Sequence, residues 1–337
     1  MNIYPLARPL LFALDPEVAH NYTLNSVSWA YKLGVMPWFS APELIKPVRI
    51  MGLEFKNALG LAAGLDKNGD YIDALGALGF GFVEIGTVTP RPQPGNPKPR
   101  LFRLPEQQAI INRMGFNNAG IEHLLVQAAK RKFNGILGIN IGKNADTPIA
   151  DAAQDYLIGL RKSYALADYV TVNISSPNTQ NLRQLQQGDE INRLLAVLKA
   201  EQAVLQAQHG KYTPIVIKIA PDLSEVELKH IAKLLREHAF DGVIATNTTI
   251  DRAMLGDHPL AREAGGLSGA PVKAKATQVV AALKSELSDA VPIIAAGGIM
   301  TAADAQEKFA AGASLVQIYS GLIYQGPQLV TDILRQL

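Results

Sequence analysis

Two lysines, a pair of serines and several amide side chains stand directly after short apolar segments of this 337-residue chain. Lys67 and Lys218 could pair with an anion or form a Schiff base with a carbonyl group. Ser176 could exchange a proton with a ligand if its position and neighbours assist it. These residue types suit a site for a small polar ligand.

The stretch VNISSPNT, residues 172–179, shows the pattern most clearly. Tyr169–Ile174 has the β-branched composition of a buried strand, yet it ends in Ser175-Ser176-Pro177-Asn178. Ser, Pro and Asn commonly end strands through local turn chemistry, so this stretch alone leaves turn and functional interpretations open.

Eight short apolar segments of this kind alternate with stretches of helical periodicity. They are Leu59–Gly64, Phe82–Thr87, Ile136–Asn140, Tyr169–Ile174, Ile215–Ile219, Gly242–Thr246, Ile293–Ala296 and Leu315–Ile318. Near-continuous apolar strands between helices are typical of a parallel sheet buried on both faces. Eight of them predict an α/β fold of the (β/α)8 TIM-barrel type, with a small N-terminal helical extension before it.

The carboxyl ends of these strands carry polar groups in seven of the eight cases. In order they are Asp66-Lys67, Thr87, Asn140, Asn173 with Ser175-Ser176, Lys218, Thr246-Asn247-Thr248, Gly297-Gly298 and Tyr319-Ser320. Barrel enzymes keep their chemistry at this rim. Turn chemistry explains each end singly but does not favour two lysines, so we expect a ligand site here.

The last two strand ends narrow the class of ligand that the site could bind. Gly297-Gly298 and Ser320-Gly321 follow strands seven and eight, where barrels commonly bind phosphate through backbone N–H groups. Glycines that only permit tight turns are the alternative. No G-x-x-x-x-G-K-[ST] pattern and no G-x-G-x-x-G after the first strand are present, which disfavours nucleoside triphosphates and dinucleotides. A phosphorylated cofactor or a sugar phosphate remains.

Loops and helix starts complete the barrel. The segments Pro90–Asn118 and Ser175–Glu190 are expected to be long structureless loops that serve as lids or binding loops. Ser224 and Glu227 form a capping-box pattern, and Thr301 is a second candidate helix cap, for a helix ending near Gly312.

The N-terminal region lies outside the repeat. Asp15-Pro16 is a typical helix start, and Val18, Tyr22, Trp29 and Leu33 follow at roughly one-face spacing before Trp38-Phe39. A helix packed on its own barrel and a helix lying shallowly in a membrane surface both fit this pattern.

Bulk composition excludes several classes. A net charge of +2 without a long basic run argues against nucleic-acid binding. The absence of cysteine removes disulfides, Cys-ligated metal centres and thiol nucleophiles, and no metal site is expected. No apolar run reaches the length of a membrane span, and no secretory signal is recognisable.

Six motifs, in order along essentially the whole chain, resemble dihydroorotate dehydrogenases. They are Ala63-Gly-Leu-Asp-Lys67, Gly86-Thr-Val-Thr-Pro90, Asn112-Arg-Met-Gly-Phe116, Val172-Asn-Ile-Ser-Ser-Pro-Asn178, Ala245-Thr-Asn-Thr248 and Gln317-Ile-Tyr-Ser320. The N-terminal extension and Ser176 resemble class 2, the quinone-reducing form. Class 1 uses a cysteine base, which this chain cannot supply.

The resemblance implies oxidation of (S)-dihydroorotate to orotate in de novo pyrimidine (UMP) biosynthesis, with FMN as hydride acceptor and a membrane quinone as final electron acceptor. It implies that Ser176 is the catalytic base, assisted by a relay through Thr179 or a water near Phe116. The implied FMN contacts are Ala63, Gly64, Leu65, Asp66, Lys67, Thr87, Asn140, Asn173, Lys218, Thr246, Gly269, Gly298, Tyr319 and Ser320. The implied substrate contacts are Lys67, Asn112, Arg113, Met114, Gly115, Phe116, Asn173, Asn178, Asn247 and Thr248.

The resemblance also divides the chain. Residues 1–45 would form a membrane-associating segment and quinone tunnel, lined by His20, Arg103 and Tyr319, and residues 46–337 would form the FMN barrel. The implied protein is a monomer, bound peripherally at the cytoplasmic face of a bacterial inner membrane.

Three other functions remain open from the residues alone. Lys67 or Lys218 could be the Schiff-base lysine of a barrel lyase acting on a sugar phosphate. The barrel could bind a phosphorylated ligand without catalysis. It could also be an FMN enzyme for another dihydropyrimidine.

Overall fold

Eight parallel strands close into a barrel in the computed structural model, which describes residues 4–38 and 44–337. Phe39, which the sequence groups with Trp38, lies outside the described residues. The strands pair in chain order, and the last pairs with the first. They are β3 (Leu59–Leu61), β4 (Phe82–Val88), β7 (Ile136–Ile141), β8 (Tyr169–Asn173), β9 (Ile215–Ile219), β10 (Gly242–Ala245), β12 (Ile293–Ala296) and β13 (Leu315–Ile318). The predicted (β/α)8 barrel is confirmed, with all eight strands close to their expected positions.

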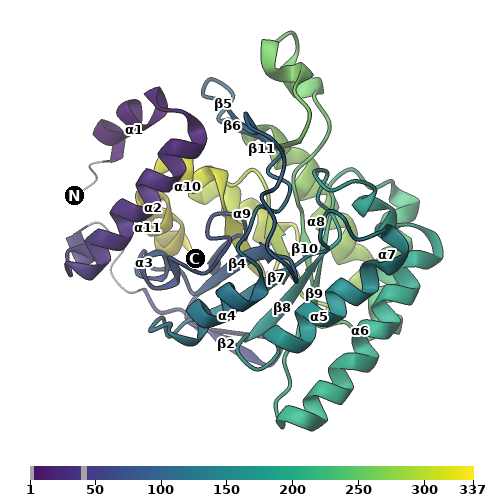
Figure 1. Cartoon of the computed structure of the whole chain (residues 1–337). Helices are drawn as coiled ribbons and strands as arrows, with labels where there is room; N and C mark the ends of the chain where they lie inside the picture. The colour runs from purple at the N-terminus through teal and green to yellow at the C-terminus, as the bar shows by residue number, and fades with distance from the viewer. Residues whose placement is uncertain (1–3, 39–43) are drawn as a thin grey trace.

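Helices follow the strands and cover the outside of the barrel (Figure 1). They are α3 (Ile72–Gly76), α4 (Ile121–Ala129), α5 (Ala152–Ser163), α6 (Gly188–His209), α7 (Glu225–Glu237), α8 (Lys273–Leu287), α9 (Ala302–Ala310), α10 (Ser320–Gln325) and α11 (Gln328–Gln336). Both predicted capping patterns are confirmed: Ser224 pairs with Glu227 at the start of α7, and Thr301 pairs with Asp304 at the start of α9. Such caps satisfy backbone N–H groups that have no partner within the helix.

The interior of the barrel is layered because strand side chains alternate between the two faces. Along β4, Val83 and Ile85 belong to the core between strands and helices, whereas Phe82 packs inside with residues such as Tyr169 and Leu315. The antiparallel hairpin of β1 (Val48–Ile50) and β2 (Leu53–Phe55) closes this end, and Phe55 packs edge-on against Phe82. Two residues further along the strands the interior becomes polar, and the ligand rim lies beyond that layer.

The segment Pro90–Asn118, predicted to be structureless, instead contains two strands. β5 (Leu101–Leu104) and β6 (Ala109–Asn112) form an antiparallel hairpin, and β11 (Gly266–Gly269) pairs with β6 from far along the chain. The prediction was wrong because β11 is short and glycine-rich, so its pairing leaves no periodic signal. This sheet stands over the rim of the barrel (Figure 1).

The segment Ser175–Glu190 is also more ordered than predicted. It holds a 3-10 turn, η3 (Leu182–Gln186), and already enters α6 at Gly188. Arg183 fixes it: the guanidinium donates to the Ser175 carbonyl at 3.0 Å and to the Asp222 carboxylate at 2.8 Å. The loop after β8 is therefore tied down at its base. Other short 3-10 turns are η2 (Ile149–Asp151), η4 (Ala253–Leu255), η5 (Pro259–Arg262) and η6 (Ala270–Val272).

The N-terminal extension consists of α1 (Tyr4–Ala13), α2 (Pro16–Lys32) and the turn η1 (Met36–Trp38). The predicted start of α2 is confirmed, because the Asp15 carboxylate accepts hydrogen bonds from the N–H groups of Glu17 and Val18. The barrel-facing side of α2 buries Ala19 and Leu24.

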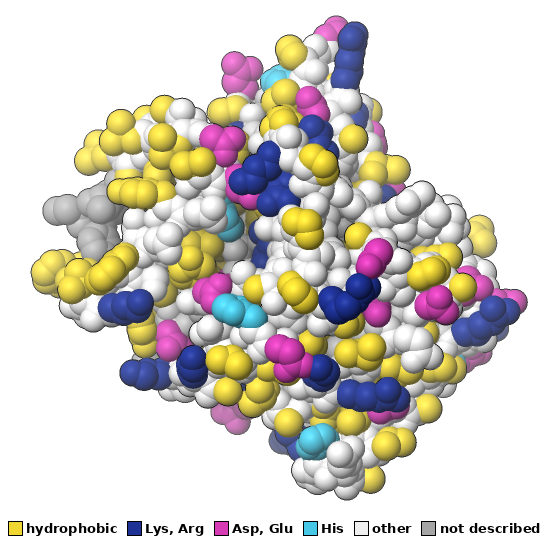
Figure 2. Space-filling model, viewed as in Figure 1, with side chains coloured by type: hydrophobic (Ala, Val, Ile, Leu, Met, Phe, Trp, Pro, Cys, Tyr) yellow, Lys and Arg dark blue, Asp and Glu magenta, His cyan; other side chains and the backbone are white. Residues whose placement is uncertain are grey.

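The apolar side chains that the sequence placed on one face of α2 point to solvent. Val18, Tyr22, Trp29 and Leu33 are 55–70% exposed, and Leu6 and Leu10 on α1 are more exposed still. Of the two arrangements that fit the sequence, packing of this face on the barrel is not observed, although the opposite side of α2 packs there. Figure 2 shows hydrophobic side chains gathered over α1 and α2. In the part of the chain that the structure describes, no helix is long and apolar enough to cross a membrane.

Candidate active site

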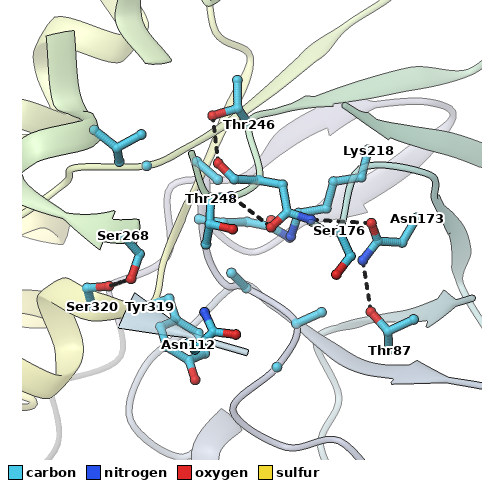
Figure 3. A pocket seen from close by; sticks show the side chains of 18 of the residues that line it. Thr87, Asn112, Asn173, Ser176, Lys218, Thr246, Thr248, Ser268, Tyr319 and Ser320 are labelled. Atoms are coloured by element: carbon cyan, nitrogen blue, oxygen red, sulfur yellow. Dashed lines mark hydrogen bonds between the residues drawn. The ribbon is translucent and has the colours of Figure 1, made fainter. Parts of the chain in front are cut away.

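One cavity opens at the carboxyl ends of the barrel strands, with a volume of about 1060 Å³ including its mouth. Of the predicted cofactor, substrate and catalytic residues, most line it. These are Ala63, Gly64, Lys67, Thr87, Asn112, Met114, Gly115, Phe116, Asn173, Ser176, Asn178, Lys218, Thr246, Asn247, Thr248, Gly269, Gly298, Tyr319 and Ser320. Figure 3 shows side chains from separate strand ends converging on this space. The residues that the sequence placed at a shared rim thus surround a single cavity.

Four predicted contacts do not reach the cavity wall. Leu65 faces the N-terminal helices, and Asp66 turns into its own loop, where its carboxylate accepts from the N–H groups of Gly69, Asp70 and Tyr71. Burial raises the Asp66 pKa to about 6, against the lowering effect of these hydrogen bonds.

Arg113 and Asn140 are the other two. Arg113 pairs with Glu263 at 2.5 Å and lies over the Phe102 ring, outside the cavity. Asn140 is fully buried one layer deeper. Its oxygen accepts from the Thr87 hydroxyl at 2.6 Å and its nitrogen donates to Glu84 at 2.7 Å, so it positions Thr87 rather than lining the wall.

A chain of amides and hydroxyls fixes the wall near Ser176. The Asn173 side chain donates to the Thr87 hydroxyl at 2.9 Å, and its oxygen accepts from the Ser175 hydroxyl at 2.9 Å. Asn247 donates to the Ser175 hydroxyl at 3.0 Å. Because each group is held by its neighbour, these side chains present fixed donors and acceptors to a ligand.

Ser176 is buried at the start of the loop after β8. Its hydroxyl oxygen accepts a hydrogen bond from the Asn178 N–H at 3.2 Å, which orients the group. Within the described residues, the Thr179 hydroxyl nearby in sequence is buried without a partner. The position on the cavity wall suits a group that exchanges a proton with a bound ligand.

The two lysines are the cations of the cavity wall. Lys218 is almost fully buried, and burial lowers its pKa against the opposing effect of the Glu84 charge. Burial also lowers the pKa of Lys67 to about 8, with Glu17 acting in the opposite direction. In their charged forms, both lysines can pair with anionic groups of a ligand.

Three polar atoms on the cavity wall are buried without a partner among the described residues: Asn178 Oδ1, Thr248 Oγ1 and Gln317 Oε1. Buried polar atoms normally have a hydrogen-bond partner, so these atoms point to a polar ligand.

Glycine allows close packing against the start of α8 at the end of the cavity opposite Ser176 (Figure 3). Gly298 has φ +75°, and a Cβ there would lie 2.3 Å from the Lys273 Cα. Ser268 and Ser320 face one another across this end, with their hydroxyls 2.9 Å apart (Figure 3). Backbone N–H groups and hydroxyls at this position suit an anion such as phosphate.

Ser268 and Gln317 line the cavity but were not assigned from the sequence. Ser268 lies on β11, whose pairing could not be read from periodicity. Gln317 begins the Gln317-Ile-Tyr-Ser320 motif, and its inward direction follows from strand alternation once β13 is placed.

A second, mostly apolar cavity of about 950 Å³ lies between α1, α2 and the barrel. It is lined by His20, Arg103 and Tyr319, the three residues that the resemblance assigns to a quinone tunnel, and Tyr319 lines both cavities. Arg103 donates to the carbonyls of Leu11 and Leu14 at the end of α1. Burial lowers the His20 pKa to about 3, helped by the Lys67 charge, so His20 is neutral at physiological pH.

Comparisons with known proteins agree with this architecture. A family model described as dihydroorotate dehydrogenase matches residues 46–337. A "Dihydroorotate dehydrogenase (quinone)" of Chromobacterium violaceum is 62% identical, covering 99% of this chain and 97% of that protein. One of Neisseria meningitidis serogroup C is 60% identical, covering 99% of each chain.

A crystal structure of DHODH in complex with ferulenol, from Eimeria tenella, superposes with a TM-score of 0.85 at 38% identity, covering 95% of this chain and 90% of the other. The prediction that the chain is an oxidoreductase is confirmed by these relatives. The chain belongs to the dihydroorotate dehydrogenase family, in its quinone-dependent class 2.

Proposed function

We propose that this protein oxidises (S)-dihydroorotate to orotate in de novo pyrimidine (UMP) biosynthesis, with FMN as the hydride acceptor and a membrane quinone as the final electron acceptor. The observation that carries the proposal is the convergence of Lys67, Ser176 and Lys218 on one cavity that meets a second, apolar cavity at Tyr319. A polar substrate could thereby deliver electrons to the flavin from the first cavity, and a lipid-soluble acceptor could take them from the flavin through the second.

The residues present fit FMN. The unpartnered Thr248 and Gln317 atoms offer hydrogen bonds to a polar ring, and the end near Gly298, Ser268 and Ser320 suits its phosphate. When bound, FMN supplies the acceptor for a hydride. Lys218 would lie at the pyrimidine edge of the flavin, where a cation stabilises the negative charge that reduction brings.

The substrate would lie against Lys67 and the amides of the rim. Lys67 would pair with its carboxylate, while Asn112, Asn178 and Asn247 would bond its ring N–H and C=O groups. Asn178 and Asn112 already contact one another at 3.1 Å, which joins the β8 loop to β6 across the site.

Ser176 would take the proton from one substrate carbon as the hydride leaves the neighbouring carbon. Free serine is a weak base, so the proton must pass on to another group. The buried, unpartnered Thr179 hydroxyl supports a relay at that position.

Orotate binding is expected to weaken as the pH rises above about 8. Lys67 has a lowered pKa of about 8, so it is charged below that pH and loses its charge above it. If the charged form holds the carboxylate, the dissociation constant should be flat below pH 8 and increase up to about tenfold per pH unit above it. Titration of the flavin absorbance with orotate measures this.

Lys67→Met provides the control for this prediction. It should bind orotate weakly and without the rise above pH 8. The same rise in Lys67→Met would assign the titration to another group.

We assign residues 1–45 to the membrane-facing segment and residues 46–337 to the barrel. The apolar cavity between α1, α2 and the barrel suits a quinone, with His20, Arg103 and Tyr319 as its polar wall. Exposed apolar side chains on α1, on α2 and directly after α2, including Leu10, Trp29 and Leu33, support shallow insertion in a membrane surface. We place the protein, as a monomer, at the cytoplasmic face of a bacterial inner membrane.

The double change Leu10→Ser and Leu33→Ser is expected to weaken binding to phospholipid vesicles by about tenfold or more. Burying one leucine side chain contributes about 1.5–3 kcal/mol, and both side chains are exposed in the protein. Vesicle sedimentation measures the loss.

The matched control is Val204→Ser on α6, an exposed apolar side chain far along the chain from α1 and α2. It should leave vesicle binding unchanged. Equal losses in both variants would show that α1 and α2 do not form the membrane surface.

Formation of orotate with a quinone acceptor tests the activity directly. Borohydride trapping of the substrate on Lys67 or Lys218 would instead support a lyase. Turnover of a different dihydropyrimidine in place of dihydroorotate would reassign the substrate.

A further inference from the structure

Glu84 is a completely buried carboxylate in the middle of the barrel. It lies on β4 two residues beyond Phe82, so its side chain enters the polar layer directly beneath the cavity. It does not line the cavity wall, and neither the substrate nor the cofactor contacts proposed above include it.

Four neutral side chains from three strands donate to this carboxylate. Asn140 donates to Oε1 at 2.7 Å, and Tyr169, Thr171 and Gln317 donate to Oε2 at 2.8, 3.1 and 2.9 Å. The two amide nitrogens can only donate, so the carboxylate oxygens are the acceptors of these bonds. Among the described residues, no cation comes within 4 Å to form an ion pair with it.

A buried charge without an ion pair is expensive, and replacing it with apolar groups would often be neutral or stabilising. The fold instead provides four donors to hold it. Lys218 lies one layer above this network. Thr171 pairs with Val216 on β9, and Lys218 stands two residues beyond Val216 on the same inner face, where it is nearly buried and opens onto the cavity. Burial lowers the Lys218 pKa, and the Glu84 charge opposes that effect.

We propose that Glu84 is the fixed counter-charge that keeps Lys218 protonated at the edge of the flavin, and that it thereby sets the reduction potential of the bound cofactor. Glu84 is a positioning residue, because it acts through Lys218 and touches neither ligand. The inference rests on the proposed function, in which FMN lies against Lys218.

Other ionisable groups surround this pair. Tyr169 contacts Glu84, and burial raises its pKa well above the usual range, so it stays neutral. Tyr319 and Lys67 line the same cavity, with pKa values of about 12 and about 8. Lys67 titrates around its pKa of about 8 whether or not Glu84 is present. The unaltered protein and a variant that lacks the Glu84 charge must therefore be compared over the same pH range.

Removing the Glu84 charge has a definite signature. With Glu84 in place, Lys218 carries the same charge before and after flavin reduction. Without it, the Lys218 pKa falls further, and Lys218 in its neutral form would take up a proton when negative charge develops on the flavin. Reduction then consumes more protons, and its potential depends more steeply on pH.

The test measures the potential of the flavin bound to the whole protein, between about pH 6 and pH 9. Glu84→Gln should show a steeper dependence than the unaltered protein, by up to tenfold in the equilibrium constant per pH unit, or about 30 mV for a two-electron couple. In a Lys218→Met background, Glu84→Gln should add no steepening. If the plot of flavin potential against pH for Glu84→Gln is parallel to that of the unaltered protein, or superposes on it, the inference is overturned.

Thr171→Val is the matched control, because it removes one hydrogen bond to Glu84 but keeps the charge. In Thr171→Val the flavin potential should change with pH at the same rate as in the unaltered protein. An unaltered protein that binds no FMN would instead refute the proposed function.

If Glu84→Gln does not retain flavin, an infrared measurement on the unaltered protein tests the inference instead. Its infrared difference spectrum between oxidised and reduced states at about pH 8 should show no gain of a protonated carboxylic acid. A gained band that shifts in Thr171→Val would show that Glu84 takes up the proton, and it would contradict a fixed charge.

Discussion

Replacing Ser176 with alanine is expected to slow reduction of the bound flavin by dihydroorotate about 10²–10⁴-fold, the usual contribution of a positioned acid–base group. The change removes only the hydroxyl oxygen, which in the protein accepts the Asn178 N–H and lies on the cavity wall. Flavin content and orotate binding should be retained, because Lys67 and the amides of the rim are unaltered. Anaerobic stopped-flow absorbance measures the reduction rate.

Ser285→Ala makes the same chemical change at an exposed position on α8 and should leave the rate unchanged. If Ser176→Ala reduces its flavin at the rate of the unaltered protein, Ser176 is not the base. If Ser176→Ala loses orotate binding as well, the Ser176 hydroxyl stabilises the loop after β8 and is not shown to accept the substrate proton.

Removing residues 1–40 is expected to abolish electron transfer to a long-tailed quinone while sparing flavin reduction by dihydroorotate. The deletion takes away α1 and α2, and with them one wall of the apolar cavity that meets the flavin site at Tyr319. The residues assigned to FMN and substrate all come from later in the chain. Separate measurement of flavin reduction and of flavin reoxidation by quinone distinguishes the two halves of the reaction.

Ala19→Trp tests the same cavity without removing any chain. Ala19 is buried on the wall, so a tryptophan there would fill space that the quinone needs. It should slow reoxidation by quinone and leave reduction by dihydroorotate intact. Full-rate reduction of membrane quinone by the truncated protein would show that the tunnel lies elsewhere.

The barrel could be predicted because its signals are local. Each strand is a short apolar, β-branched run, and helix caps such as Ser224 with Glu227 mark where the next helix begins. Strand ends in a parallel barrel must share one rim, so Lys218 and Ser176 could be brought together from topology alone.

The parts that could not be predicted depend on distant segments. The β5–β6 hairpin is completed by β11, more than 150 residues later, and this places Ser268 in the cavity. The sequence also did not show which strand-end side chains reach the cavity and which are buried beneath it. Asn140 and Asp66 stand at strand ends like the other site residues, but their side chains bond to the protein itself.

The exposed face of α2 shows a different limit of prediction from the sequence. Apolar spacing at Val18, Tyr22, Trp29 and Leu33 marks one side of a helix but not what covers it. The side that packs on the barrel is the one with Ala19 and Leu24. Periodicity identified the face, and only the structure showed that it is open.

The visible spectrum of the purified protein under anaerobic conditions tests the central claim most directly. The protein should be yellow from bound FMN, and adding dihydroorotate should bleach the flavin band while orotate forms in equal amount. A colourless protein that takes up no FMN, or a yellow one that keeps its colour with dihydroorotate bound, would contradict the assignment of this cavity.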